Sequence, residues 1–355
     1  MKSIFIGSVS ECSGKNLISL GVARHLTEKG LKVGYFKPIG VSPVDNENIV
    51  TDEDVLFFKK VLGLHDPLSH LCPVVLTSAL MNEIYNDAHK DMMKKVTDAY
   101  GKVSQDKDVT LISGFGDLSS GCSTGCSQIE LLKKLDAKAI IIDRFVLEER
   151  DMVDWFVYVK NIIGDRLLGV VFNRVPEARI EFVKSKIVPF LRAKGIETLG
   201  IIPEDAVLHA VPVRDIVQHL CGKVVCCEEE LDNLVESLVV GAMTVDSALK
   251  YFRKVNNKAV VTGGDRGDIQ LAAMETSTRC LILTGDLYPH QNIMTVAIEK
   301  KIPIVVVPYD TLTTIGKFET VLGHLSLHDE SKVECAVDIV SKHIDFKLID
   351  KHAGT

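Results

Sequence analysis

The stretch that decides the fold is Gly7-Ser8-Val9-Ser10-Glu11-Cys12-Ser13-Gly14-Lys15-Asn16, which joins an apolar run at residues 3–8 to a helical pattern at residues 15–29. Proteins bind phosphate with inward-turned backbone N–H groups, a glycine that permits close approach, a helix N-terminus and a lysine charge. Gly14 and Lys15 at the start of a helix supply these features. The stretch therefore predicts a phosphate-binding turn between a strand and a helix, with a purely structural loop as the alternative.

The turn departs from the usual phosphate-loop spacing, G-x-x-x-x-G-K-[ST]. Val9 occupies the position of the first glycine, and Asn16 replaces the hydroxyl residue that normally holds Mg²⁺. The amide oxygen of Asn16 is a poorer match for a metal than a hydroxyl. We therefore expect nucleotide binding here more than nucleotide hydrolysis.

Apolar runs without polar alternation follow the turn and predict strands that are covered on both faces. They alternate with helical patterns, which favours an α/β fold with a doubly wound, mostly parallel sheet. The predicted strands are residues 3–8, 32–38, 109–113, 139–143, 168–173 and 198–202. The predicted helices are residues 15–29, 54–62, 84–103, 127–133, 150–163 and 178–194.

A second, smaller α/β series follows a change of pattern near residue 220. It predicts strands at 258–262, 280–284 and 304–307, and helices at 269–276, 292–300, 311–322 and 332–343. Residues 231–240 are expected to form a connecting helix. The predicted organisation is a first domain at 1–220, a linker at 221–240, a second domain at 241–345 and a ragged tail at 346–355.

Composition excludes several classes of protein. The 355 residues include 41 Lys and Arg against 48 Asp and Glu, a net charge of −7, and nucleic-acid binding needs clusters of basic residues. No apolar run reaches about 18 residues, so we expect no membrane span. The nine cysteines are expected to be reduced thiols in a cytoplasmic protein. Cys122 and Cys126 have no nearby His partner and do not suggest zinc.

Polar residues follow several predicted strands at the edge where ligands bind in open α/β folds. Lys37 ends the second strand, and the loop at 113–117 follows the third. Asp52 and Asp54 begin a helix and are candidates for a metal, although acidic residues also favour the first turn of any helix. Asn173 ends the fifth strand, where an amide either reads a purine edge or caps a turn.

Residues 1–220 resemble the dethiobiotin synthetase-like family of phosphate-loop proteins, and especially the version that forms the N-terminal region of long phosphate acetyltransferases. The resemblance rests on residues 7–16, 34–39, 113–117 and 169–173 and on Pro203-Glu204-Asp205. It implies ATP and Mg²⁺ as cofactors. By this resemblance Lys15 and Lys37 are the catalytic residues, and the nucleotide contacts are Ser13, Gly14, Lys15, Asn16, Asn173 and Pro203. The metal ligands it suggests are Asn16, Asp54 and Asp117. Ser113 stands where the family's enzymes have a carboxylate, which counts against catalysis.

The last 110 residues resemble the DRTGG domain, which follows the synthetase-like part in long phosphate acetyltransferases. The resemblance rests on residues 260–270 and on a leading segment near 239–243. Strand ends carrying Gly, Thr and Asp predict a second pocket, with tight turns and helix caps as the alternative. The predicted residues of this pocket are Gly263, Gly264, Asp265, Arg266, Thr284, Gly285, Asp310 and Thr311.

Three functions remain open at this point. The first is an ATP-binding regulatory protein without acetyl transfer of its own, working with a separate enzyme of acetate or acyl-phosphate metabolism. The second is an ATP- and Mg²⁺-dependent ligase or cyclase of the dethiobiotin synthetase type. The third is a scaffold with no catalytic activity. The resemblance also implies a homodimer, and neither nucleic acid nor membrane is expected as a partner.

Overall fold

The chain folds into two compact units, seen in a computed structural model that describes residues 2–10, 13–86, 91–146, 152–205, 208, 210–323 and 330–355. The first unit comprises Met1–Glu204 and Leu327–Thr355, and the second comprises Asp205–Ser326. The second unit thus begins earlier than the predicted boundary at 220–240. The last residues of the chain return to the first unit.

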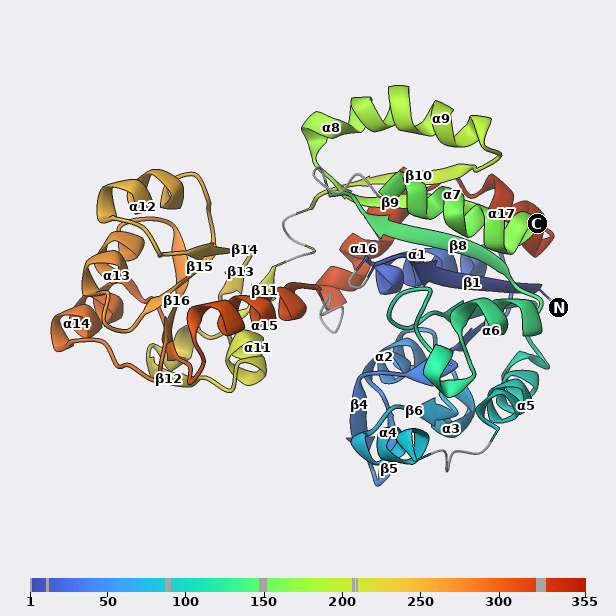
Figure 1. Cartoon of the computed structure of the whole chain (residues 1–355), viewed down its shortest axis with the longest axis horizontal. Helices are drawn as coiled ribbons and strands as arrows, with labels where there is room; N and C mark the ends of the chain where they lie inside the picture. Colours follow the sequence, from blue (N-terminus) through green and yellow to red (C-terminus); the bar gives the residue numbers. More distant parts are fainter. Residues whose placement is uncertain are drawn as a thin grey trace. The chain divides into compact units, whose positions relative to one another are not determined.

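A parallel sheet forms the centre of the first unit and confirms the predicted fold class. Its order is β10-β9-β8-β1-β7-β2, and Figure 1 shows β10, β9, β8 and β1 side by side. Each of the six strands overlaps a predicted one. Their bounds are β1 (Lys2–Ser8), β2 (Val33–Phe36), β7 (Val109–Ser113), β8 (Lys138–Arg144), β9 (Leu167–Val175) and β10 (Thr198–Pro203).

Because all these strands are parallel, their carboxyl ends lie at one edge of the sheet. In the sheet, β1 lies between β7 and β8. Along the chain, β1 is followed first by β2 and β7 on one side of it and then by β8, β9 and β10 on the other side. The strand order therefore reverses at β1, and open α/β sheets bind ligands at such a switch point. The predicted phosphate-binding turn follows this strand.

The first unit also contains helices. They are α1 (Lys15–Glu28), α2 (Glu53–Val61), α3 (Leu68–Leu71), α4 (Ser78–Tyr85), α5 (Met92–Ser104), α6 (Gln128–Lys134), α7 (Met152–Ile163), α8 (Glu177–Phe182), α9 (Val188–Ala193), α16 (Glu330–His343) and α17 (Lys347–Ala353). A π-helical turn, Val183–Ile187, joins α8 to α9. The predicted helix at 84–103 is wrong at its start, because α4 and α5 are separate helices and residues 87–90 lie outside the described part.

After the second unit, the chain re-enters the first unit with α16, which packs against α1. A Cβ atom at Gly21 would lie 2.2 Å from Cγ1 of Val340, so the two helix backbones approach closely there. The predicted ragged tail is also wrong, because Ile349 of α17 is fully buried and Asp350 forms an ion pair with Lys29 and a hydrogen bond with His25.

Two small sheets stand beside the carboxyl edge near β2. β3 (Ile39–Gly40) pairs with β6 (Val74–Val75), and β4 (Pro43–Asn46) forms an antiparallel hairpin with β5 (Ile49–Asp52). These short strands were not predicted. The hairpin ends at Asp52 and so brings the start of α2 to the sheet edge.

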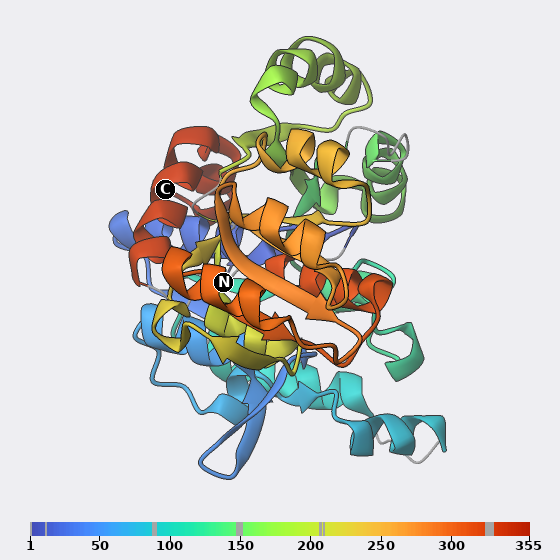
Figure 2. The same ribbon diagram turned by 90° about the vertical axis from the view of Figure 1, so that its left-hand side faces the viewer.

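The second unit is a separate α/β structure, coloured from yellow to orange-red in Figure 2. Its main sheet has the order β12-β17-β16-β15-β14, with only β12 antiparallel. The strands are β11 (Val211–Pro212), β12 (Lys223–Cys226), β13 (Leu234–Val235), β14 (Ser237–Val240), β15 (Lys258–Gly263), β16 (Thr278–Thr284) and β17 (Ile304–Val306). The helices are α11 (Val213–His219), α12 (Val245–Phe252), α13 (Gly267–Met274), α14 (Gln291–Lys300) and α15 (Thr311–Gly323).

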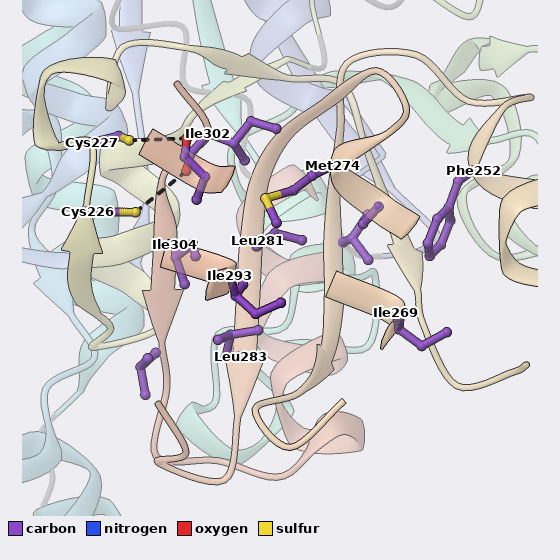
Figure 3. Close-up of a cluster of buried hydrophobic side chains, with 14 of the residues drawn as sticks. Cys226, Cys227, Phe252, Ile269, Met274, Leu281, Leu283, Ile293, Ile302 and Ile304 are labelled. Atoms are coloured by element: carbon purple, nitrogen blue, oxygen red, sulfur yellow. Dashed lines mark hydrogen bonds between the residues drawn. The ribbon is translucent and has the colours of Figure 1, made fainter. Parts of the chain in front are cut away.

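Alternate side chains of this sheet enter two hydrophobic cores. Leu281 and Leu283 pack with Phe252 and Ile293 from the helices on one face (Figure 3), whereas Ile282 belongs to the core on the other face. Burial of both faces explains why these strands appear in the sequence as continuous apolar runs. The predicted helix at 231–240 is wrong, because this segment forms β13 and β14.

None of the helices in the described part of the chain is both long and apolar enough to cross a membrane.

Candidate functional site

The turn between β1 and α1 places Lys15 at the carboxyl edge of the first unit's sheet. Gly14 is the N-cap of α1 and adopts a left-handed conformation, with φ of 96°. Nζ of the half-buried Lys15 donates to Oγ of Ser8 at 2.8 Å and to the carbonyl oxygen of Gly116 at 2.9 Å. The ammonium group therefore lies over the ends of β1 and β7. Glu11 and Cys12 of the predicted turn lie outside the described part.

Asn173 holds the turn from the end of β9. Its Nδ2 donates to the carbonyl oxygen of Ser13 at 2.9 Å, and its Oδ1 accepts from the backbone N–H of Arg174. Both Ser13 and Asn173 are buried. In this structure the amide of Asn173 is thus engaged with the turn, the arrangement expected of the capping alternative, and contact with a nucleotide base stays a prediction.

The buried Lys37 and Asp52 and the half-buried Asp54 form an ion network at the end of β2. Nζ of Lys37 donates to Oδ1 of Asp52 at 2.7 Å and also to Oδ2 of Asp54. Burial alone would lower the pKa of Lys37, but the charges of Asp54 and Asp52 outweigh it and raise that pKa above its ordinary value. Lys37 therefore stays charged and tied to both carboxylates.

Asp52 has the structural role that the sequence left open. Its side chain accepts from the backbone N–H groups of Val41, Ser42 and Asp54, at 2.8 to 3.0 Å. It is the N-cap of α2. This fully buried carboxylate fixes the start of the helix and so the position of Asp54.

The structure brings two of the three predicted metal ligands together. Nδ2 of Asn16 donates to Oδ1 of Asp54 at 2.6 Å, while the other oxygen of Asp54 contacts Lys37. Asp117 instead accepts hydrogen bonds from Ser119 and Ser120 within its own loop. Partial burial raises the pKa of Asp117, but these hydrogen bonds outweigh it and lower the pKa below its ordinary value.

These residues are a poor fit for Mg²⁺. Hard cations take oxygen ligands, whereas both oxygens of Asp54 already have nitrogen partners, and one of those partners is a positive charge. Within the described residues, no group of three or more His, Cys, Asp and Glu side chains is arranged to hold a metal ion. The metal site stays a prediction.

Pro203 ends β10, the strand at the outer margin of the sheet, where it pairs with Val175 of β9. It therefore lies at the same edge as the turn, with β9 and β8 between β10 and β1. Its contact with a nucleotide also stays a prediction.

Sequence reasoning missed two residues at this edge, Ser10 and Asp143. The hydroxyl of Ser10 donates to Oδ1 of Asp143 at 2.5 Å, and the carboxyl group of Asp143 is buried at the end of β8. A signal was present, because Asp143 is the last residue of the strand predicted at 139–143, and the carboxyl ends of parallel strands lie at the ligand-binding edge. Ser113 is buried at the end of β7, on the other side of β1. The carboxylate at this edge therefore comes from Asp143 of β8 and not from position 113 of β7.

The Gly-Gly turn of the second unit is held by Gln270 of α13. Nε2 of Gln270 donates to the carbonyl oxygens of Gly263 and Gly264, at 3.0 and 3.1 Å. A Cβ atom at Gly263 would lie 2.5 Å from Oδ1 of Asp265, so the Asp265 side chain folds over this glycine. Arg266 is the N-cap of α13. These contacts make a compact turn at the carboxyl end of β15.

The neighbouring strand ends meet this turn at the same edge. Oγ1 of Thr284, at the end of β16, lies 3.2 Å from Oγ1 of Thr311 at the start of α15. Gly285 continues the chain with φ of 83°. Asp310 accepts from the backbone N–H and the hydroxyl of Thr313, as a helix cap does. The predicted residues are brought together, but their contacts are those of turns and caps, so a ligand site here stays a prediction.

A parallel sheet with a glycine–lysine turn after its central strand defines an α/β protein of the phosphate-loop NTPase type. Residues 2–211, more than half of the chain, match the family model described as AAA domain, and the chain belongs to that family. Residues 215–321 match the model described as DRTGG domain. Both parts of the predicted resemblance are confirmed.

Similar proteins agree with this division. The phosphate acetyltransferase of Pseudomonas aeruginosa is 26% identical over 383 residues, which cover 100% of this chain and 52% of that protein. The chain therefore spans about half the length of the phosphate acetyltransferases that it matches. The ATP-dependent dethiobiotin synthetase of Methanococcus vannielii is 23% identical over 203 residues, 56% of this chain and 92% of that protein.

Among solved structures, the CBS and DRTGG domains of the regulatory region of Clostridium perfringens pyrophosphatase cover 43% of this chain and 74% of theirs, at 18% identity and a TM-score of 0.30. That likeness is too weak to support an inference about function.

Proposed function

We propose that the first unit binds ATP at the carboxyl edge of its sheet, with the phosphates over Lys15. The observation that carries the proposal is the position of the Lys15 ammonium group, 2.8 Å from Ser8 and 2.9 Å from Gly116 at the strand-order reversal. A cation beside a helix N-terminus attracts phosphate. The likeness to an ATP-dependent synthetase over these residues supports the same ligand.

We propose further that ATP is bound without rapid hydrolysis. Phosphoryl transfer depends on stabilisation of negative charge by a metal ion and by cationic groups that are free to move onto the phosphates. Here Lys37 is tied to Asp52 and Asp54, and the amide nitrogen of Asn16 occupies the other oxygen of Asp54. Because Lys37 and both oxygens of Asp54 already have partners, and the metal site is poor, these residues favour binding of ATP over its hydrolysis.

The role that we propose for this binding is regulatory. The chain matches one half of phosphate acetyltransferases and combines the AAA and DRTGG regions, which supports control of an enzyme of acyl-phosphate metabolism. We propose in addition that the chain acts as a homodimer. We propose the cytoplasm as the compartment, where cysteines stay reduced. Phosphate acetyltransferase activity measured with and without the purified chain, at saturating ATP, tests this role.

A second candidate, an ATP-dependent ligase or cyclase, is favoured by the presence of Lys15, Lys37 and Asp54 at one sheet edge. It requires Lys37 to leave its carboxylate partners when substrate binds. Release of ADP in the presence of amino-carboxylates, and its loss in Lys15→Ala, would favour this candidate over the first.

Calorimetric titration with ATP, ADP and GTP, with and without Mg²⁺, tests the primary proposal. We expect wild type to bind ATP and Lys15→Ala to bind it about tenfold or more weakly, a difference of about 1.4 kcal/mol. Lys29→Ala, at the other end of α1, is the matched control and should bind as wild type does. Absence of ATP binding to wild type, or equal binding to Lys15→Ala, would overturn the proposal.

A further inference from the structure

A buried carboxylate lies beside the turn and has no role in the function proposed above. Asp143 is the penultimate residue of β8 and is only 4% exposed. The turn runs along the end of this strand, because the backbone N–H of Val9 donates to the carbonyl oxygen of Ile142 at 3.4 Å. An ionised group is seldom buried unless it has hydrogen-bond partners that offset the loss of water.

The partners of Asp143 include the turn itself. Oδ1 of Asp143 accepts from the hydroxyl of Ser10 at 2.5 Å and from the backbone N–H of Arg144 at 2.9 Å. Oγ of Ser13 lies 3.4 Å from the same oxygen and 2.7 Å from Oγ of Ser10. The Ser13 hydroxyl also donates to the carbonyl oxygen of Ser10 at 2.8 Å. The carboxylate thus fixes Ser10, and Ser10 fixes Ser13.

Ser13 is held from a second strand as well. Its carbonyl oxygen accepts from Nδ2 of Asn173 on β9, so β8 anchors its side chain through Ser10 and β9 anchors its backbone. The next residue, Gly14, is the N-cap of α1 and has no room for a Cβ atom beside Asn173. The two anchors therefore determine where the backbone enters the helix whose first residue is Lys15.

We propose that Asp143 is a positioning residue for phosphate binding, which it supports by ordering the turn through Ser10 and Ser13 without contacting the ligand. This inference rests on the proposed function for its effect on ATP, but its effect on the turn stands apart from it. The family's carboxylate position on β7 is Ser113 in this chain, and Asp143 supplies a carboxylate from β8. Oδ1 of Asp143 accepts a hydrogen bond from the hydroxyl of Ser10, and a hydrogen bond to an ionised carboxylate is stronger than a neutral one.

Three variants separate positioning from other roles. Asp143→Ala removes both acceptor oxygens. Asp143→Asn keeps an amide oxygen that accepts the Ser10 hydroxyl but removes the charge. Ser10→Ala removes the contact from the side of the turn and leaves β8 unchanged, which covers the case that Asp143→Ala does not fold. Glu28→Ala, at an exposed position of α1, is the control.

Each variant is measured for ATP affinity and for hydrogen exchange of the amides of residues 9–17 without ligand. We expect Asp143→Ala and Ser10→Ala to weaken ATP binding about tenfold and Asp143→Asn to remain within about threefold of wild type. We expect faster amide exchange in the turn of the first two variants and unchanged exchange in the core strands.

If the amides of the turn exchange at the wild-type rate in both Asp143→Ala and Ser10→Ala, the inference is overturned, whatever the ATP affinity. Faster exchange with unchanged ATP affinity overturns the link to phosphate binding. If wild type itself binds no ATP, the proposed function fails, while faster exchange in both alanine variants still supports the ordering of the turn by Asp143.

Discussion

Replacement of Gly14 by alanine tests the geometry of the turn more sharply than any charge change. Gly14 has φ of 96°, and a Cβ atom there would lie 2.2 Å from Nδ2 of Asn173. Such a distance is far below van der Waals contact. The Asn173 amide would have to leave the carbonyl oxygen of Ser13, to which it donates at 2.9 Å in a buried environment.

Two effects reduce the folding stability of the Gly14→Ala variant, and their free energies add. A left-handed conformation costs an alanine about 1–2 kcal/mol. An unpaired buried polar group at Asn173 or Ser13 costs a further ~1–3 kcal/mol. The expected loss of about 2–5 kcal/mol is large beside the ~5–15 kcal/mol that stabilises a typical domain.

Urea unfolding followed by the fluorescence of Trp155, the single tryptophan and part of α7 in the first unit, measures this loss. Gly30→Ala is the matched control, because Gly30 also has positive φ, 85°, but nothing lies within 4 Å of its Cβ position. The control should lose only the conformational cost, about 1–2 kcal/mol. Adding Asn173→Ala should reduce the extra cost of Gly14→Ala. Equal destabilisation by the two glycine variants would refute this reasoning.

Three further outcomes are expected. Lys37→Met leaves the Asp52 carboxylate buried without its cation, so urea unfolding should show a loss of stability of about 3–5 kcal/mol. The double variant with Asp52→Asn should recover part of this stability. A loss below about 1 kcal/mol in Lys37→Met would contradict the ion network. Burial lowers the pKa of Lys258 from 10.5 to about 8, so the unfolded chain binds more protons between these values and stability should rise with pH there, by at most about 1.4 kcal/mol per pH unit. The Lys258→Met variant should lack this rise. Parallel pH profiles of stability for wild type and variant would exclude the contribution of Lys258. Iodoacetamide should alkylate exposed Cys122 quickly and spare Cys280, because burial raises the pKa of the Cys280 thiol; mass spectrometry that finds both modified equally fast would contradict this.

The sheet of the first unit could be predicted because its strands are covered on both faces. Burial of this kind requires continuous apolar runs, and residues 109–113 and 139–143 show them plainly. Parallel pairing then places the end of every strand at one edge, so Lys15, Lys37 and Asn173 were expected there. The sequence alone did not indicate the contacts between these ends, because they join residues that are far apart in the chain. Ser10 and Asp143 are separated by 133 positions.

The errors in the fold also have a physical origin. Residues 231–240 carry apolar side chains at helical spacing, but Val239 and Val240 pair with β15, and pairing with a neighbouring strand overrides local preference. The apolar face of α16 was evident from its pattern. Its packing partner was not, because an apolar stripe does not specify which unit buries it. The close approach of Gly21 and Val340 and the contacts of α16 with β10 assign it to the first unit.

A crystal structure of the chain with a non-hydrolysable ATP analogue tests the central claim most directly. We expect the terminal phosphates within hydrogen-bonding distance of Nζ of Lys15, which would exchange its contact with Ser8 or Gly116 for phosphate oxygens. Phosphates bound in the second unit, or a Lys15 ammonium group that keeps both contacts while the analogue binds elsewhere, would contradict the account.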